Sequence, residues 1–151
     1  MLTLGDDGQF GIRTIDTEHQ HLINFLHLVE ETAPENRPRL ATKRLVSSMR
    51  GFLLTHFNNE ENLMSAIDYS GIDRHMSVHS CMLSTLDIMA CDLEVSGESS
   101  MIIEFLTEWT VSHYGADDRE LAWFVKDVRQ RALGRRQQQP QQPGTGAHVW
   151  T

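Results

Sequence analysis

Apolar residues recur at three- and four-residue steps along four stretches of this chain, which is the spacing of one face of an α-helix. In the first stretch the repeat runs through Leu22, Leu26 and Val29, and His19 falls on the same face. The pattern predicts four helices, over about residues 16–31, 39–66, 73–95 and 99–133. Short connections between amphipathic helices favour antiparallel neighbours. We therefore predict an all-α fold, an antiparallel up-down-up-down four-helix bundle.

Residues with capping or turn preferences separate the predicted helices. Asp16 or Thr17 is suited to cap the first helix, and Pro38 stands just before the second. The Tyr-Ser-Gly sequence at 69–71 predicts a turn between the second and third helices. Residues 1–14 contain three glycines and little apolar repeat, so we expect an extended N-terminal arm.

The composition of the chain changes at Gly134. The segment 134–151 is rich in Gln, Pro and Gly and has no apolar repeat. It cannot bury enough apolar surface to offset its ordering entropy. We therefore expect one domain over residues 1–133, followed by a disordered C-terminal tail. A docking role for the last five residues is the alternative, because Trp150 is an unusual residue to leave exposed.

Composition and charge argue against several classes of function. With 151 residues and a formal net charge of −8, the chain has the size of one domain and is unsuited to general nucleic-acid binding. It has no apolar run near the roughly 20 residues of a membrane span, and its first residues do not resemble a signal peptide. Cys81 and Cys91 lie ten positions apart on one predicted helix, too far to form a disulfide. Reduced cysteines and the lack of an export signal predict a cytoplasmic protein. The negative charge and the lack of a long apolar run predict no nucleic-acid or membrane partner.

Two pairs of potential metal ligands flank the predicted turn. His56 and Glu60, and likewise His75 and His79, are four residues apart and so one helical turn apart on one face. Imidazole combined with carboxylate is a ligand set suited to iron, zinc or copper. A zinc-peptidase motif would need a Glu where Met76 stands, and this stretch lacks the Glu-x-x-His spacing of ferritin-like di-iron sites. The residues therefore predict a His-rich metal site.

His19 allows two interpretations, because it lies on the apolar face of the first predicted helix. It is either a core histidine that is hydrogen-bonded to a neighbour, or a ligand that points toward the same centre as His56.

Four motifs together resemble the hemerythrin family. They are IDTEH at 15–19, HFNNEE at 56–61, HMSVH at 75–79 and HYGADD at 113–118. The resemblance covers about residues 11–128. It implies a four-helix bundle that holds a di-iron centre, in which two Fe ions are bridged by an oxo or hydroxo group and by two carboxylates.

Carried over position by position, the resemblance implies seven metal ligands. One iron would be bound by His75, His79 and His113, the other by His19 and His56, and both would be bridged by Glu60 and Asp118. The second iron would keep an open position for dioxygen.

The bridging carboxylate of the fourth helix has two candidates. A four-residue step from His113 reaches Asp117, which an ideal α-helix favours. The family spacing of five reaches Asp118, which lies about 140° round from His113 on such a helix. We choose Asp118 and keep Asp117 as the alternative.

The function that the resemblance implies is reversible dioxygen binding, for storage, delivery or scavenging. The oxygen pocket would include Thr110, Trp109 and Phe57, and Thr110 stands where the family commonly has a leucine. Two alternatives stay open: sensing of O2 or redox state through a signalling or redox partner, and enzymatic turnover of peroxide or nitric oxide at the same centre. We expect a monomer, and an oxygen-binding protein rather than an enzyme.

Overall fold

The computed structural model describes residues 9–32, 39–96 and 100–138, and every regular element within these ranges is a helix. In chain order the elements are α1 (Arg13–Thr32), α2 (Arg39–Ala66), α3 (Ile72–Ser96), α4 (Ser100–His113), the π turn η2 (Tyr114–Asp118) and α5 (Arg119–Gln138). The prediction of an all-α fold is confirmed.

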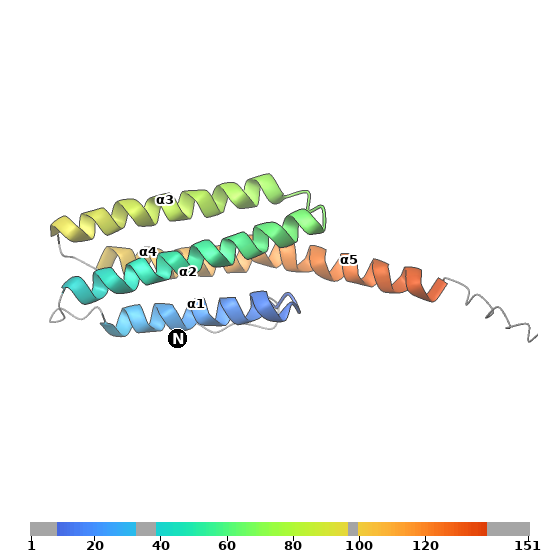
Figure 1. The fold of residues 1–151 in the computed structure, drawn as a ribbon, viewed down its shortest axis with the longest axis horizontal. Helices are drawn as coiled ribbons and strands as arrows, with labels where there is room; N and C mark the ends of the chain where they lie inside the picture. The colour runs from blue at the N-terminus through green and yellow to red at the C-terminus, as the bar shows by residue number, and fades with distance from the viewer. Residues whose placement is uncertain (1–8, 33–38, 97–99, 139–151) are drawn as a thin grey trace, which may run out of the picture.

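Four long helical segments lie side by side and run alternately in opposite directions (Figure 1). α2 packs against α1 and α3, and α4 packs against the same two helices, which closes the bundle. The fourth segment consists of α4, η2 and α5 in direct succession, and its last turns extend past the ends of the other three (Figure 1). The predicted up-down-up-down topology is therefore also confirmed.

The residues just before α1 are tied to the bundle. α1 begins at Arg13, so Asp16 lies in its first turn and the prediction of a cap at 16 or 17 is wrong. Asp16 Oδ1 instead accepts a hydrogen bond of 2.7 Å from the backbone N–H of Phe10. The Phe10 side chain is fully buried, and Arg129 of α5 donates to the Gly11 carbonyl oxygen at 2.8 Å. Residues 1–8 of the expected arm lie outside the described residues.

The turn between α2 and α3 forms where the sequence predicted it. The Tyr69 backbone N–H donates to the Met64 carbonyl oxygen at 3.0 Å, and the Tyr69 ring packs against Phe124 with ring centroids 5.1 Å apart. A Cβ atom at Gly71 would lie 2.7 Å from Tyr69 Cζ, so any other residue here would have to displace the Tyr69 ring. The packed turn fixes the register of α2 against α3.

The fourth helical segment departs from the prediction in its middle. We expected one α-helix over residues 99–133, but the chain forms a π turn at Tyr114–Asp118. A π turn closes i→i+5 hydrogen bonds and so brings residues five apart toward the same side of the helix. His113 Nε2 and Asp118 Oδ1 are 3.0 Å apart. The offset of about 140° expected for an ideal α-helix therefore does not arise.

Two apolar clusters lie on either side of a polar layer. The larger cluster is built from α1 to α4 and includes Phe57 and Leu106. The smaller one lies at the arm, the α2–α3 turn and α5, and includes Met64 and Leu121. Between Phe57 and Met64 on α2, and between Leu106 and Leu121 on the fourth segment, the buried residues are mostly polar. This layer holds the candidate site.

The end of α5 also differs from the prediction. The helix continues to Gln138, so the part of the expected tail from Gly134 to Gln138 is helical, and residues 139–151 lie outside the described residues. Cys81 and Cys91 are exposed and do not form a disulfide, as predicted. Among the helices that the structure describes, none combines the length and the apolar character needed to cross a membrane.

Candidate metal centre

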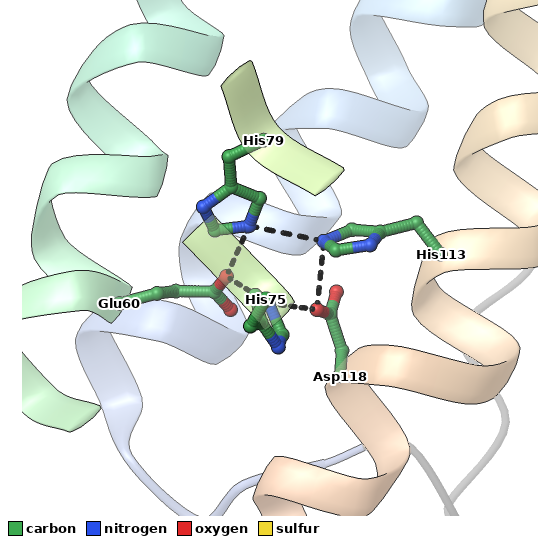
Figure 2. Close-up of side chains that lie close together, drawn as sticks. All are labelled: Glu60, His75, His79, His113 and Asp118. Atoms are coloured by element: carbon green, nitrogen blue, oxygen red, sulfur yellow. Dashed lines mark hydrogen bonds and ion pairs between the residues drawn. The ribbon is translucent and has the colours of Figure 1, made fainter. Parts of the chain in front are cut away.

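The polar layer contains seven imidazole and carboxylate side chains, each no more than 4 % exposed. They are His19, His56, Glu60, His75, His79, His113 and Asp118. They come from α1, α2, α3 and the fourth helical segment, and Figure 2 shows five of them with their polar ends toward one another. The structure therefore brings together all seven residues that the sequence singled out.

Glu60 lies between two groups of imidazoles. Its Oε1 atom is 3.4 Å from His19 Nε2 and 3.8 Å from His56 Nε2. Its Oε2 atom is 3.6 Å from His75 Nε2 and 3.4 Å from His79 Nε2. Glu60 therefore offers one oxygen atom to each group.

Asp118 is placed in the same way from the opposite helix. Its Oδ2 atom is 3.3 Å from His19 Nε2, while its Oδ1 atom is 3.3 Å from His75 Nε2 and 3.0 Å from His113 Nε2. The side chains form two groups that could each hold a metal ion, and Glu60 and Asp118 belong to both. The five-residue group adds His75, His79 and His113, and the four-residue group adds His19 and His56. Two shared carboxylates are suited to bridge two adjacent cations.

Three of the imidazoles contact a further carboxylate on the side that faces away from the centre. These contacts are His56 Nδ1 to Glu18 Oε2 at 3.1 Å, His79 Nδ1 to Glu61 Oε1 at 3.0 Å and His113 Nδ1 to Asp117 Oδ2 at 3.3 Å. Because an ionised carboxylate can only accept a hydrogen bond, each Nδ1 atom carries the proton. Each Nε2 atom then presents its lone pair to the centre, which is the form of histidine that binds metal ions.

The facing nitrogen atoms of His79 and His113 test whether a cation fits this centre. Their Nε2 atoms lie 3.2 Å apart. With Nδ1 donating to Glu61 and Asp117, two neutral imidazoles would face each other with their Nε2 lone pairs, an arrangement that a shared cation would stabilise. Both Glu60 oxygen atoms are also buried, without a hydrogen-bond partner among the described residues. A metal ion that accepts these lone pairs fits the donor set.

The electrostatics of the site favour positive charge. Burial alone would lower the pKa of His19 and of His75, but Asp118 and Glu60 outweigh it and raise both pKa values to about 9. Burial raises the pKa of each carboxyl, and Asp118 raises that of Glu60 further. The neighbouring imidazoles nevertheless hold the pKa of both carboxyls well below the ordinary range. Two ionised carboxylates and two protonated imidazoles thus balance one another, and binding of a metal ion would displace the protons.

Two of the three predicted oxygen-pocket residues pack against imidazoles of the five-residue group. The Phe57 ring stacks on His79 with centroids 3.8 Å apart, and the Trp109 ring stacks on His113 at 4.3 Å. Phe57 also lies 5.8 Å from the His56 ring, so it contacts residues of both groups. These rings give the imidazoles a rigid apolar surround on the side of the larger cluster.

Different rings surround His19, and the sequence reasoning did not single them out. Phe10 lies 5.3 Å and Tyr114 lies 4.9 Å from the His19 ring, measured between centroids. The Tyr114 hydroxyl is buried without a hydrogen-bond partner in the described part of the chain, and burial with the nearby Asp118 raises its pKa to about 12. Thr110, the third predicted pocket residue, is buried on α4. Phe10 precedes the first helix and Tyr114 lies in the π turn, so no helical repeat could have placed either ring beside His19.

The hemerythrin HHE cation-binding domain matches residues 11–124 of this chain. That range includes both shared carboxylates and all five imidazoles of the centre. The chain belongs to the hemerythrin family.

Three bacteriohemerythrins are similar to this hemerythrin-family chain over most of its length. The protein of Stenotrophomonas maltophilia (strain R551-3) is 25% identical over 127 residues, which are 83% of this chain and 82% of the relative. The protein of Pseudomonas paraeruginosa is 23% identical over 125 residues, 82% of this chain and 79% of the relative. The protein of Pseudomonas aeruginosa (strain LESB58) is 22% identical over the same shares.

The sequence reasoning also missed two of the outer carboxylates, Glu18 and Glu61, and it considered the third, Asp117, only as a bridging ligand. Each stands next to an inner residue in the chain: Glu18 before His19, Glu61 after Glu60, and Asp117 before Asp118. Consecutive helical residues point about 100° apart, so the outer carboxylate passes beside the inner side chain and reaches the back of a neighbouring imidazole. A carboxylate directly beside a predicted ligand in the sequence was therefore the signal that could have identified the outer carboxylates. Asp117, the alternative bridging candidate, lies in this outer position and contacts the far side of His113.

Proposed function

We propose that this chain holds two iron ions and binds dioxygen reversibly, for storage, delivery or scavenging. The observation that carries the proposal is the placement of Glu60 and Asp118, each with one oxygen atom toward each group of imidazoles. Membership of the hemerythrin family supports iron over zinc or copper. When bound, the two iron ions would supply the electrons that dioxygen takes up and returns.

The proposed ligands divide unequally between the two metal positions. Glu60 and Asp118 would bridge both, with His75, His79 and His113 on one iron and His19 and His56 on the other. The second position therefore has one protein ligand fewer, which would leave room for dioxygen.

The chain's own residues would keep the centre intact and dry. The two ionised carboxylates offset part of the cations' charge, and the outer carboxylates hold three imidazoles in the orientation that metal binding needs. The stacked rings of Phe57 and Trp109 restrict the movement of His79 and His113. Apolar clusters above and below the layer exclude water, which would otherwise compete with dioxygen.

Metal analysis of the purified chain tests the two-iron part of the proposal. We expect about two iron ions per chain, and we expect His79→Ala to lower that number because it removes a buried ligand. His21→Ala is the matched control, since His21 is exposed on α1 and lies outside the cluster. A single zinc ion at full occupancy would contradict the two-iron proposal.

Optical spectra over repeated oxygen cycles test reversibility. The reduced, iron-loaded chain is exposed to O2, and the O2 is then removed under vacuum or argon. We expect the absorption of the oxygenated form to appear and disappear over several cycles. Permanent oxidation in the first cycle would contradict a storage or delivery role and would favour redox sensing or enzymatic turnover.

A further inference from the structure

A chain of three side chains connects the surface of α3 with the centre. Arg74 donates a hydrogen bond of 2.6 Å to Asp117 Oδ1, and the other carboxylate oxygen of Asp117 lies 3.3 Å from His113 Nδ1. On its inner side, His113 Nε2 lies 3.0 Å from Asp118 Oδ1. The Arg74 side chain is 69% exposed. An exposed cation is therefore two contacts away from an imidazole of the proposed metal site.

The outer carboxylates differ in the groups that hold them. Glu18 accepts a hydrogen bond of 2.6 Å from the neutral amide of Asn59, whereas Asp117 is paired with the full positive charge of Arg74. The carboxylate-to-imidazole distance is 3.1 Å for Glu18 and 3.0 Å for Glu61, but 3.3 Å for Asp117. A carboxylate that shares its charge with a guanidinium is a weaker acceptor for the imidazole N–H.

We propose that Asp117 is a positioning residue for His113 and that Arg74 limits its effect, so that the two residues shift the reduction potential of the iron centre in opposite directions. The inference rests on the two-iron function proposed above. A carboxylate that accepts the Nδ1 proton makes the imidazole a more electron-rich ligand, which stabilises the oxidised, more highly charged metal. Because the positive charge of Arg74 opposes that effect, Arg74 favours the reduced metal.

Other charged groups of the bundle provide matched controls. Arg50 and Asp87 form an ion pair between α2 and α3 that, like the Arg74 pair, joins two helices, but neither residue contacts an imidazole of the centre. Glu120 lies 3.6 Å from Arg74 on the same surface and contacts none of those imidazoles either. Asp87→Asn therefore breaks a comparable ion pair elsewhere, and Glu120→Gln removes a negative charge beside Arg74.

The test is the midpoint reduction potential of the iron-loaded full chain, measured by spectroelectrochemistry. We expect Asp117→Asn to raise the potential and Arg74→Gln to lower it, whereas Arg74→Lys stays close to the unsubstituted chain. Asp87→Asn should leave the potential unchanged, and Glu120→Gln should shift it less than Asp117→Asn does. In chelator competition, Asp117→Asn should also lose roughly 10- to 100-fold in metal affinity, as is typical when the outer partner of a metal-bound histidine is removed.

A merely structural role for the ion pair predicts a different pattern. Loosening of the π turn would shift the potential in the same direction in Asp117→Asn and Arg74→Gln, and that result would overturn the inference. So would an unchanged potential in Arg74→Gln. If Asp117→Asn retains no iron, the two Arg74 variants decide the question, because Arg74 touches none of the seven inner side chains. Failure of the unsubstituted chain to load two iron ions would instead contradict the proposed function.

Discussion

Replacing Phe10 with alanine should detach the residues before α1 from the bundle and destabilise the whole domain. Phe10 is fully buried, its ring packs 5.3 Å from the His19 ring, and its backbone N–H donates to Asp16. The substitution removes an aromatic ring from the smaller apolar cluster and leaves the N–H···Asp16 contact without a packed anchor. The side of His19 that Phe10 covers then becomes open to water.

The size of the effect follows from the burial of the ring. Phenylalanine-to-alanine substitutions in well-packed cores cost about 3–5 kcal/mol of unfolding free energy. Phe10 precedes the first helix, where the backbone can relax into the void, so we expect about 3 kcal/mol. That is a large share of the roughly 5–15 kcal/mol by which such domains are stable. Asp16→Ala, which removes only the acceptor, should cost about 1 kcal/mol.

Urea unfolding of the metal-free chain measures these changes, with Leu40→Ala as the control. Leu40 is 56% exposed, and its substitution should change the unfolding free energy by about 0.5 kcal/mol or less. The double variant of Phe10 and Asp16 should cost less than the sum of the single variants, because both side chains hold the same segment. A cost below about 1 kcal/mol for Phe10→Ala would refute the conclusion that this residue belongs to the core.

Two further substitutions test the turn and the oxygen pocket. Gly71→Ala should cost about 1–3 kcal/mol in urea unfolding, because its Cβ would lie 2.7 Å from the buried Tyr69 ring. Gly51→Ala, on a helix face with nothing within 4 Å, should instead stabilise the chain by up to about 1 kcal/mol, and equal effects at both positions would contradict the packing argument. Thr110→Leu should slow the spontaneous oxidation of the oxygenated iron form roughly fivefold. Loss of one hydrogen bond from the Thr110 hydroxyl would raise the activation barrier by about 1 kcal/mol, which corresponds to that change in rate. An unchanged or faster optical decay would show that the Thr110 hydroxyl does not act on the oxygen pocket.

The helices follow from the sequence because their apolar repeat reflects burial directly. α2 has the predicted bounds, Arg39–Ala66, and the α2–α3 turn lies at the predicted Tyr-Ser-Gly sequence. The predicted start of α1 was wrong for an identifiable reason. Helix-capping preferences assigned Asp16 to the helix end, whereas in the fold its carboxylate serves the backbone of Phe10. That contact depends on tertiary packing, which local preferences do not contain.

Four inner side chains, the pairs His56 with Glu60 and His75 with His79, were predictable because their spacing within one helix is local information. His19 allowed two interpretations, and His113 and Asp118 were assigned only through the resemblance to the hemerythrin family. How the inner side chains face one another was not predictable. Which oxygen of Glu60 faces His19 and which faces His75 depends on how α1 and α3 pack on α2. The outer carboxylates Glu18 and Glu61 were missed for the same reason, and Asp117 was considered only in the bridging position. Glu18 reaches from α1 to His56 on α2, and on their own helix such residues look like ordinary solvated charges.

The π turn shows where reasoning from an ideal helix fails. A helical wheel ranks Asp117 above Asp118 as the partner of His113, because it assumes α-helical geometry throughout. A π turn gives up part of the regular hydrogen-bond pattern and is rare in proteins. Here it brings Asp118 within 3.3 Å of the imidazoles of His19, His75 and His113, and it leaves Asp117 on the outside, where Arg74 holds it. These contacts offset the cost of the irregular backbone. The local shape of the fourth helical segment therefore follows from the polar centre that it completes. In the sequence, this shape corresponds to the five-residue spacing between His113 and Asp118.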